Sequence, residues 1–208
     1  MVSVVLPVSH KDKTEWLSRI EARLAEVEGL EVLRAEGKTR AERLQRGIEA
    51  ASHDTILLHH PRSIVDKAGL EWLRDHAEEI AWGGFKHEFD AEHGLLRFTS
   101  WWSNNFRGPV AGILYLDHCI FFQRRLLTRP IPPVEIFEDT ELSYILREQC
   151  RPKILPFRVM TSAVRFTTNG VYRQAALNQG LKWQFYFKRS SKQMNDRYER
   201  GLGLNDEG

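Results

Sequence analysis

The chain has 208 residues, 42% of them hydrophobic and 11% aromatic, which is enough apolar material for one sizeable domain and excludes a largely disordered chain. Its 30 Lys and Arg residues against 28 Asp and Glu give a net charge of +2, too balanced for a protein that binds nucleic acid. The two cysteines, Cys119 and Cys150, exclude a disulfide framework, and no apolar run is long enough to span a bilayer. We therefore expect a soluble, cytoplasmic protein.

The first third of the chain alternates short apolar runs with amphipathic segments. The apolar runs predict strands at residues 1–9, 30–35 and 55–59. Apolar residues at helical spacing predict helices at 13–28, 40–51 and 63–76. Such alternation is typical of an α/β domain with a mainly parallel central sheet.

The second half of the chain is less regular. Gly83 and Gly84 lie in a predicted strand at 80–89, where they indicate close approach of another segment to the backbone. Pro156 interrupts a predicted strand at 153–159 and indicates an edge or a bulge. The other expected elements are a helix at 95–106, a strand at 120–124, a proline-rich loop at 130–133, a helix at 137–149 and one or two helices from Gly170 onward.

Five stretches, in this order along the chain, resemble motifs of glycosyltransferase family 2. Residues 2–7 (VSVVLP) are similar to the opening strand SVVIP, and residues 40–59 (RAERLQRGIEAASHDTILLH) to GRAxQxNxGAxxAxGDxLLFLHAD. Residues 115–125 (YLDHCIFFQRR), 135–146 (EIFEDTELSYIL) and 161–177 (TSAVRFTTNGVYRQAAL) resemble YGDQGIFVRR, PLMEDVELSRRL and TSARRWERRGVWRTTL of a short, single-domain bacterial subgroup. The resemblance implies the three-layer GT-A fold and transfer of a sugar from a nucleotide diphosphate donor to an unknown acceptor.

The resemblance also implies roles for two adjacent acidic residues. In the family the acid of the motif around Glu138 and Asp139 is the base that takes a proton from the acceptor hydroxyl, so we expect Asp139 to be the inverting general base and Glu138 to support it. The alternative is that two acids at the start of a helix only complement its dipole.

Other residues are candidates for binding the substrates. The resemblance places Pro7, Lys38 and Arg40 on the donor side, where the guanidinium of Arg40 could hold a phosphate, with Arg43 as a further cation. It places Asp117 and His118 near the acceptor. Three tryptophans could stack on a sugar ring or belong to the core, namely Trp82, Trp101 and Trp102.

The chain departs from the family at the acid that holds a divalent ion, Mn²⁺ or Mg²⁺, on the donor diphosphate. The corresponding residues are His59, His60 and Pro61. Two hypotheses follow: His59 and His60 ligate a metal ion together with Asp117 and His118, or one histidine is buried and the other exposed, with Lys38 and Arg40 neutralising the phosphates. The strand unit that holds the nucleobase in the family is also shortened here. An alternative to a transferase is therefore a non-catalytic binding or regulatory protein with the same fold.

The end of the chain is basic. Residues 162–200 contain eight Lys and Arg against two acidic residues, a formal charge of +6. We expect residues 1–161 to form the α/β domain and residues 162–208 a basic, aromatic helical extension packed on it. Residues 181–189 (LKWQFYFKR) are typical of a helix that lies peripherally on a membrane, here at its inner face. The alternative is that these aromatic residues pack on the domain or on a second copy in a homodimer.

Overall fold

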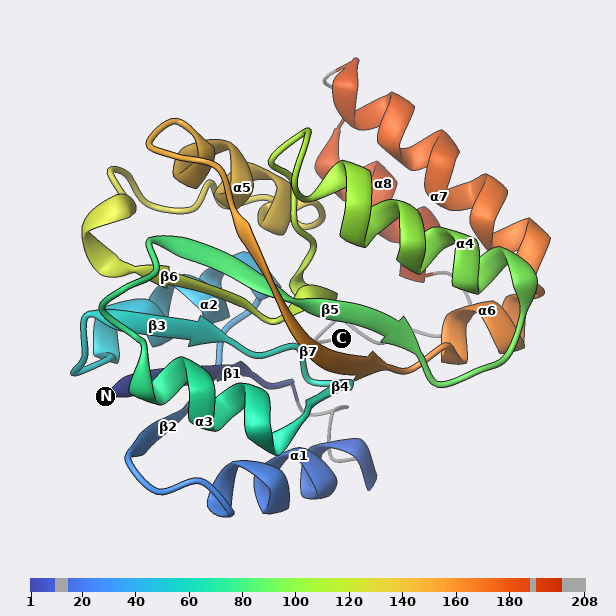
Figure 1. Ribbon diagram of the computed structural model, residues 1–208. Helices are drawn as coiled ribbons and strands as arrows, with labels where there is room; N and C mark the ends of the chain where they lie inside the picture. The colour runs from blue at the N-terminus through green and yellow to red at the C-terminus, as the bar shows by residue number, and fades with distance from the viewer. Residues whose placement is uncertain (10–14, 188–189, 200–208) are drawn as a thin grey trace.

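One sheet runs through the part of the protein that the structure describes (Figure 1). The computed structural model describes residues 1–9, 15–187 and 190–199. The strand order is β2-β1-β3-β6-β5-β7-β4, and β6 and β4 run against the other strands, so the sheet is mainly parallel as predicted. The strands are β1 (Val2–Pro7), β2 (Leu30–Ala35), β3 (Thr55–Leu58), β4 (Ser63–Val65), β5 (Trp82–Phe89), β6 (Ile120–Gln123) and β7 (Lys153–Thr161).

The described residues also form α-helices, which lie between the strands in the sequence and follow the last strand. A π-helical turn, Ser103–Arg107, continues α4, and the predicted start of the first helix at Lys13 lies outside the described residues. The α-helices are α1 (Glu15–Ala25), α2 (Arg40–Ala50), α3 (Lys67–Asp75), α4 (Gly94–Trp102), α5 (Glu138–Arg147), α6 (Val164–Asn169), α7 (Val171–Tyr186) and α8 (Ser191–Glu199).

The helices cover both faces of the sheet and produce the three layers that the sequence predicts (Figure 1). On one face, Ile20 of α1 and Leu70 of α3 belong to the same buried cluster as Val4 of β1. On the other face, Leu44 of α2 belongs to the same buried cluster as Val5 of β1. Successive residues of β1 therefore enter different layers, which explains why this strand is apolar throughout.

Ser63 begins a strand, although the sequence predicts a helix there. Residues Ser63–Val65 pair antiparallel with residues 159–161 of β7, and α3 begins only at Lys67. The two β-branched residues that follow Ser63 favour the extended conformation, and β7 supplies their hydrogen-bonding partners. Because the strand has only three residues and its partner lies far along the chain, local periodicity does not reveal it.

The glycine pair of β5 and Pro156 of β7 have the roles that the sequence predicts. A Cβ atom on Gly83 would lie 1.9 Å from the carbonyl oxygen of Lys153, and one on Gly84 would lie 2.9 Å from the Cβ of His118. The register between β5 and β7 shifts where Pro156 lies, as expected for a bulge around a residue that has no N–H to donate. These close approaches bring the segment before β6 onto β5.

The C-terminal helices lie beside α4 and contact the loop that precedes α5 (Figure 1). Ile136 from that loop forms a small buried cluster with Leu181 of α7 and Met194 of α8. No helix among residues 1–9, 15–187 and 190–199 is long and apolar enough to cross a bilayer. Of the predicted extension, residues 188–189 and 200–208 lie outside the described residues.

Candidate functional site

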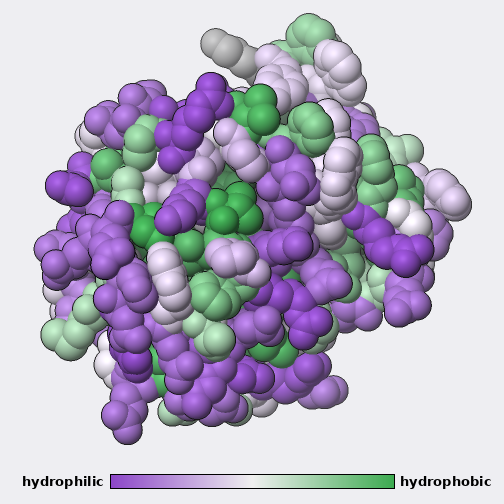
Figure 2. Space-filling view, in the orientation of Figure 1, coloured by the Kyte–Doolittle hydropathy of each residue, from purple (hydrophilic) through white to green (hydrophobic). Residues whose placement is uncertain are grey.

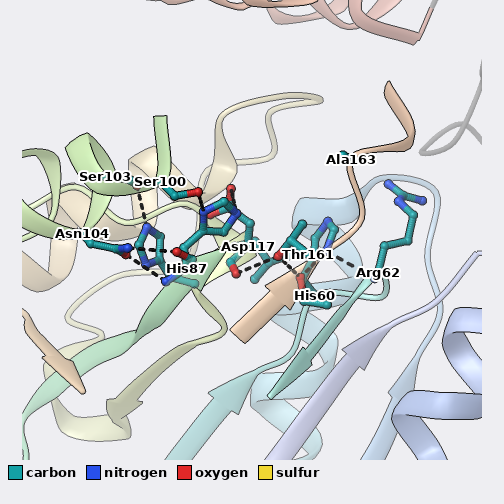
Figure 3. A network of polar contacts seen from close by, with 12 residues as sticks. His60, Arg62, His87, Ser100, Ser103, Asn104, Asp117, Thr161 and Ala163 are labelled. Carbon is teal, nitrogen blue, oxygen red and sulfur yellow. Dashed lines mark hydrogen bonds and ion pairs between the residues drawn. The ribbon is translucent and has the colours of Figure 1, made fainter. Parts of the chain in front are cut away.

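A cavity of about 180 Å³ lies at the edge of the sheet where the parallel strands end, which is where open α/β sheets bind ligands. His60 follows β3, Thr161 ends β7, and Asp117 lies just before β6, which runs in the opposite direction. Figure 3 shows Asp117 between His87 on one side and Thr161 and His60 on the other. Arg40, the first residue of α2, also lines this cavity, which we call the polar cavity.

The polar cavity carries a surplus of positive charge. Two of its cations have a buried carboxylate partner, because Arg40 forms an ion pair with Glu138 and Arg165 forms one with Glu199. The remaining cations outnumber the two carboxylates of the lining, so an anionic ligand suits the cavity. The charged lining residues are Arg40, Arg62, Arg107, Arg165, Lys182, Asp117 and Asp139.

The predicted acid pair, Glu138 and Asp139, forms the start of α5, and the two carboxylates have different surroundings. Glu138 is fully buried and ion-paired with the Nε of Arg40, whereas Asp139 lines the polar cavity. The Oδ2 of Asp139 accepts a hydrogen bond of 3.0 Å from the backbone N–H of Leu116. Glu138 therefore holds the guanidinium of Arg40, and Asp139 is the acid that a ligand can reach.

Burial and the neighbouring carboxylate of Glu138 raise the pKa of Asp139 to about 6, against the opposing charge of Arg40. Glu138 and Asp139 in turn raise the pKa of Arg40 although burial opposes this, so the guanidinium stays charged. A carboxylate with a pKa near neutrality both accepts and releases a proton readily, as general acid–base chemistry requires.

Asp117 is the second acid of the polar cavity. Its Oδ2 lies 3.5 Å from the Nε2 of His87, and its Oδ1 has no hydrogen-bond partner among the described residues. Burial alone would raise the pKa of Asp117, but interactions with His87, His118 and Arg107 lower it to about 2. Asp117 is therefore ionised at neutral pH and leaves one acceptor oxygen for a ligand.

His118, the neighbour of Asp117 in the chain, is buried and does not line the polar cavity. It acts on Asp117 by lowering the pKa of that carboxyl group. Its Nδ1 donates to the carbonyl oxygen of Phe85 at 2.9 Å, and its Nε2 lies 2.7 Å from the Oγ of Ser103, which donates to it in this tautomer. Burial lowers the pKa of His118 to about 3, so the ring is neutral. His118 therefore does not contact the cavity, and its role in substrate binding stays a prediction.

Both acidic segments have a residue with a left-handed backbone beside them. Cys119, two residues after Asp117, has φ of 48°, and Phe137, immediately before Glu138, has φ of 67°. These are the non-glycine residues with positive φ in the described ranges. Such conformations cost of order 1–3 kcal/mol and gather at functional sites, where surrounding contacts hold them.

The two histidines after β3 are both buried, so the expectation that one would be exposed is wrong. The Nδ1 of His59 lies 3.1 Å from the carbonyl oxygen of His60, and burial lowers the pKa of His59 to about 4. The Nδ1 of His60 lies 3.0 Å from the Oγ of Ser63, and burial also lowers the pKa of His60. His60 lines the polar cavity and His59 does not.

Among the described residues, no three His, Cys, Asp or Glu side chains come together in a group that could hold a metal ion. Mg²⁺ and Mn²⁺ prefer several oxygen ligands. The polar cavity offers Asp117 and Asp139, and one oxygen of Asp139 already accepts a backbone hydrogen bond. The residues present do not fit a resident Mg²⁺ or Mn²⁺ ion, and the metal role of His59 and His60 stays a prediction without a third ligand.

The other residues predicted on the donor side lie away from the polar cavity. Pro7 is buried at the end of β1, opposite Ala35. Lys38 is exposed, and its backbone N–H donates to Glu42. Arg43 is buried in α2. Of the residues predicted to contact the donor, the structure brings Arg40 to the cavity.

The three tryptophans separate into two groups. Trp82 is a core residue, and its indole N–H donates to the carbonyl oxygen of Cys150 at 2.8 Å. Trp101 and Trp102 are about half exposed on α4, where they belong to a cluster of aromatic rings with Phe98 and Phe106. The expected alternative, a core tryptophan, therefore applies to Trp82.

Several cavity residues were not singled out from the sequence. Arg107 lies at the end of a π-helical turn, for which the sequence has no pattern, and Tyr115 begins the quoted stretch 115–125 but was given no role. Arg165 and Lys182 were counted in the charge of the basic tail, and Lys182 also lies in the quoted stretch 181–189. Arg165 does lie inside the quoted stretch 161–177, which is the signal that would have found it.

No protein-family model matches this sequence, and no curated protein matches it. Solved structures do match its fold. TarS from S. aureus, as a fragment of residues 1–349, has a TM-score of 0.57 at 11% identity over 95% of this chain and 70% of that chain. The same fragment in complex with UDP-GlcNAc has a TM-score of 0.59 at 11% identity, over 77% of this chain and 58% of that one.

A third similar structure is glucosyl-3-phosphoglycerate synthase from Mycobacterium tuberculosis in complex with Mg²⁺ and UDP. Its TM-score is 0.51 at 18% identity, over 78% of this chain and 69% of that chain. At such identities the likeness establishes the fold alone. The protein therefore has the GT-A glycosyltransferase fold that the sequence predicts.

Proposed function

We propose that this protein is a glycosyltransferase that moves a sugar from a nucleoside diphosphate donor to an acceptor hydroxyl, with Asp139 as the inverting general base. The observation that carries the proposal is the position of Asp139, which lines the polar cavity with its pKa raised to about 6. The fold supports the donor class, since structures similar to this chain hold UDP-GlcNAc or UDP.

In the proposed reaction the acceptor oxygen attacks the anomeric carbon of the donor sugar while Asp139 takes the hydroxyl proton. The bond from the anomeric carbon to the diphosphate oxygen breaks, and the nucleoside diphosphate leaves with the electron pair. Negative charge therefore grows on the leaving group as the bond breaks. Arg62, which lines the same cavity, is the cation that would stabilise this charge.

Glu138 and Arg40 act on the reaction through Asp139. The hydrogen bond from the Leu116 N–H orients the carboxylate of Asp139, and the ion pair of Glu138 with Arg40 fixes the first turn of α5. The negative charge of Glu138 raises the proton affinity of Asp139, while Arg40 limits the increase. This balance keeps the base active near neutral pH.

A second candidate function is a binding or regulatory protein with the same fold and no turnover. It is favoured by the sequence His59-His60-Pro61 in place of the family's metal-binding acid, and by the lack of a metal-binding group among the described residues. Such a protein would keep the fold, would have lost the donor chemistry and would release no product.

Calorimetric titration with a panel of UDP- and other nucleoside diphosphate sugars, in Mn²⁺ and in chelator, tests both functions. We expect one donor to bind, and nucleoside diphosphate to be released slowly even with water as acceptor and more slowly in Asp139→Asn. Binding with no release from the unmutated protein would favour the non-catalytic function. If no donor binds in either condition, the transferase function is wrong and the non-catalytic function is favoured. Donor binding that is undiminished in chelator would contradict the metal role of His59 and His60.

A further inference from the structure

A second cavity of about 680 Å³ lies beside the polar cavity, between α4 with its π-helical turn and α7. Hydrophobic residues are visible in Figure 2 on the side of the molecule where α4 and α7 lie. The volume is within the range of roughly 300–1,000 Å³ that is usual for small-molecule sites. We call it the aromatic groove, and its aromatic lining residues include Phe98, Trp102, Phe106, Trp183, Phe185 and Tyr186.

The walls of the aromatic groove are exposed to a degree that is unusual for large aromatic residues. The side of α7 contributes Trp183, which is 65% exposed, and the side of α4 contributes Trp102, which is 49% exposed. The ring of Trp102 stacks on that of Phe106 with centroids 4.9 Å apart and planes 12° from parallel. A contiguous exposed apolar surface of this kind marks a site for an apolar ligand.

The aromatic groove continues into the polar cavity. Arg107, Tyr115 and Lys182 line both cavities, so they mark the junction. The guanidinium carbon of Arg107 lies 3.6 Å from the centroid of the Tyr115 ring, and the Nζ of Lys182 lies 5.4 Å from it. A ligand in the groove would therefore meet two cations before it reaches the cavity of Asp139.

The two cations at the junction interact with the carboxylates of the polar cavity only beyond ion-pair distance. No described carboxylate forms an ion pair with Arg107 or Lys182, although Arg107 donates to Ser103. Burial and the charge of Arg107 lower the pKa of Lys182 to about 8. An anionic group between the two side chains would remove this repulsion and supply the missing partner.

We propose that the acceptor is a hydroxyl-bearing amphiphile with a phosphate group, whose apolar chain lies in the aromatic groove and whose phosphate lies between Arg107 and Lys182. A single-chain ligand of this kind satisfies both the aromatic walls and the cation pair, whereas a flat protein surface would leave the groove unfilled. The role as acceptor rests on the proposed transferase function. The binding of such a molecule does not depend on that function and is measured without a donor.

Decyl phosphate, kept below the concentration at which it forms micelles, is a suitable probe, with inorganic phosphate and decanol as half-ligands. The fluorescence of Trp102 and Trp183 reports its entry into the groove. We expect decyl phosphate to bind about tenfold or more tightly than either half-ligand, because apolar burial and a charge-assisted hydrogen bond each contribute. Equal affinity for decyl phosphate and inorganic phosphate would overturn the proposal.

Variants locate the site. Lys182→Met removes one cation and should weaken decyl phosphate binding by about tenfold, the effect of losing one hydrogen bond to a charged group. Trp102→Ala, and Trp183→Ala as a second variant, should each weaken it by about fivefold through loss of apolar contact. Tyr172→Ala is the matched control, since Tyr172 is 74% exposed on α7 and lines neither cavity.

Lipid vesicles distinguish a single bound amphiphile from a membrane surface. If the protein binds phosphatidylglycerol vesicles, with no difference in Trp102→Ala, and fails to bind monomeric decyl phosphate, the aromatic surface contacts membranes and the proposal is wrong. If decyl phosphate binds with the expected variant effects while no nucleotide sugar binds, the ligand class is supported and the transferase function is contradicted.

Discussion

The carboxylate of Glu138 forms an ion pair with Arg40, a residue 98 positions earlier in the chain, while Asp139 beside it receives a backbone N–H. Arg40 therefore pairs with the buried acid, Glu138, and not with Asp139, which lines the cavity. As a result the charge of Arg40 lowers the pKa of Asp139 less than burial and Glu138 raise it. Two adjacent acids of similar chemistry acquire different roles through their partners.

Asp139→Asn should slow the chemical step by about 10²–10⁴-fold with little change in donor affinity, because the amide keeps the shape of the side chain and cannot accept the proton. Single-turnover kinetics and donor titration separate the two effects. Glu141→Gln, two positions further along α5 and outside the lining of both cavities, is the control and should retain turnover. Near-normal turnover of Asp139→Asn would mean that the acid pair only complements the helix dipole.

The pH dependence of kcat/KM should follow the ionisation of Asp139. Since the base must be deprotonated and burial with Glu138 raises the pKa of Asp139 to about 6, kcat/KM should rise from pH 5 to 7 and then level off. The rise should be absent from the residual activity of Asp139→Asn. A profile that is flat between pH 5 and 7 in the unmutated protein would contradict the assignment.

The same shift predicts that Asp139 destabilises the folded protein at neutral pH. A carboxyl group whose pKa is 3.8 in the unfolded chain and about 6 in the folded one contributes stability below pH 3.8, and this is lost as the pH rises through 6. Asp139→Asn should therefore be more stable than the unmutated protein at pH 8, by about 1–3 kcal/mol, and this advantage should shrink towards pH 4. Urea unfolding at the two pH values measures the difference. If the gain in stability of Asp139→Asn over the unmutated protein is smaller at pH 8 than at pH 4, the prediction is wrong.

Glu138→Gln should destabilise the protein by about 3–5 kcal/mol, because it removes the buried carboxylate that pairs with the largely buried guanidinium of Arg40. The double variant Arg40→Met, Glu138→Gln should recover part of this loss, which thermal or urea unfolding would show. In a folded Glu138→Gln protein the kcat/KM profile should move to lower pH, since Glu138 no longer raises the pKa of Asp139. Loss of activity as large as in Asp139→Asn, without a shift of the profile, would assign the base role to Glu138.

Gly83→Ala should prevent β5 from pairing normally with β7, because the new Cβ would lie 1.9 Å from the carbonyl oxygen of Lys153. We expect a loss of stability of roughly 3 kcal/mol or more, or failure to fold. Gly180→Ala in α7 is the matched control: a Cβ there meets nothing within 4 Å, so it should stabilise the protein by about 0.5–1 kcal/mol. Circular dichroism melts of both variants test this, and equal stability of the two would show that β5 can move away from β7.

The sequence predicted best where structure depends on neighbours along the chain. The first strand and the helix that begins at Arg40 were predicted within a few residues, because apolar periodicity is a local feature. The strand at Ser63 was missed, since its extended conformation depends on pairing with residues 159–161. The position of the C-terminal helices over the cavity likewise depends on long-range contacts.

By itself, the sequence determined the fold class and the two acidic motifs, because both depend on the spacing and order of residues that are neighbours along the chain. Only the tertiary structure decided that Arg40 pairs with Glu138, that Arg107 and Lys182 meet around Tyr115, and that the aromatic residues of α4 and α7 face one groove. These residues come from segments far apart in the chain. Their protonation and partners depend on burial and on distances between side chains, which exist only after the sheet and helices have packed together.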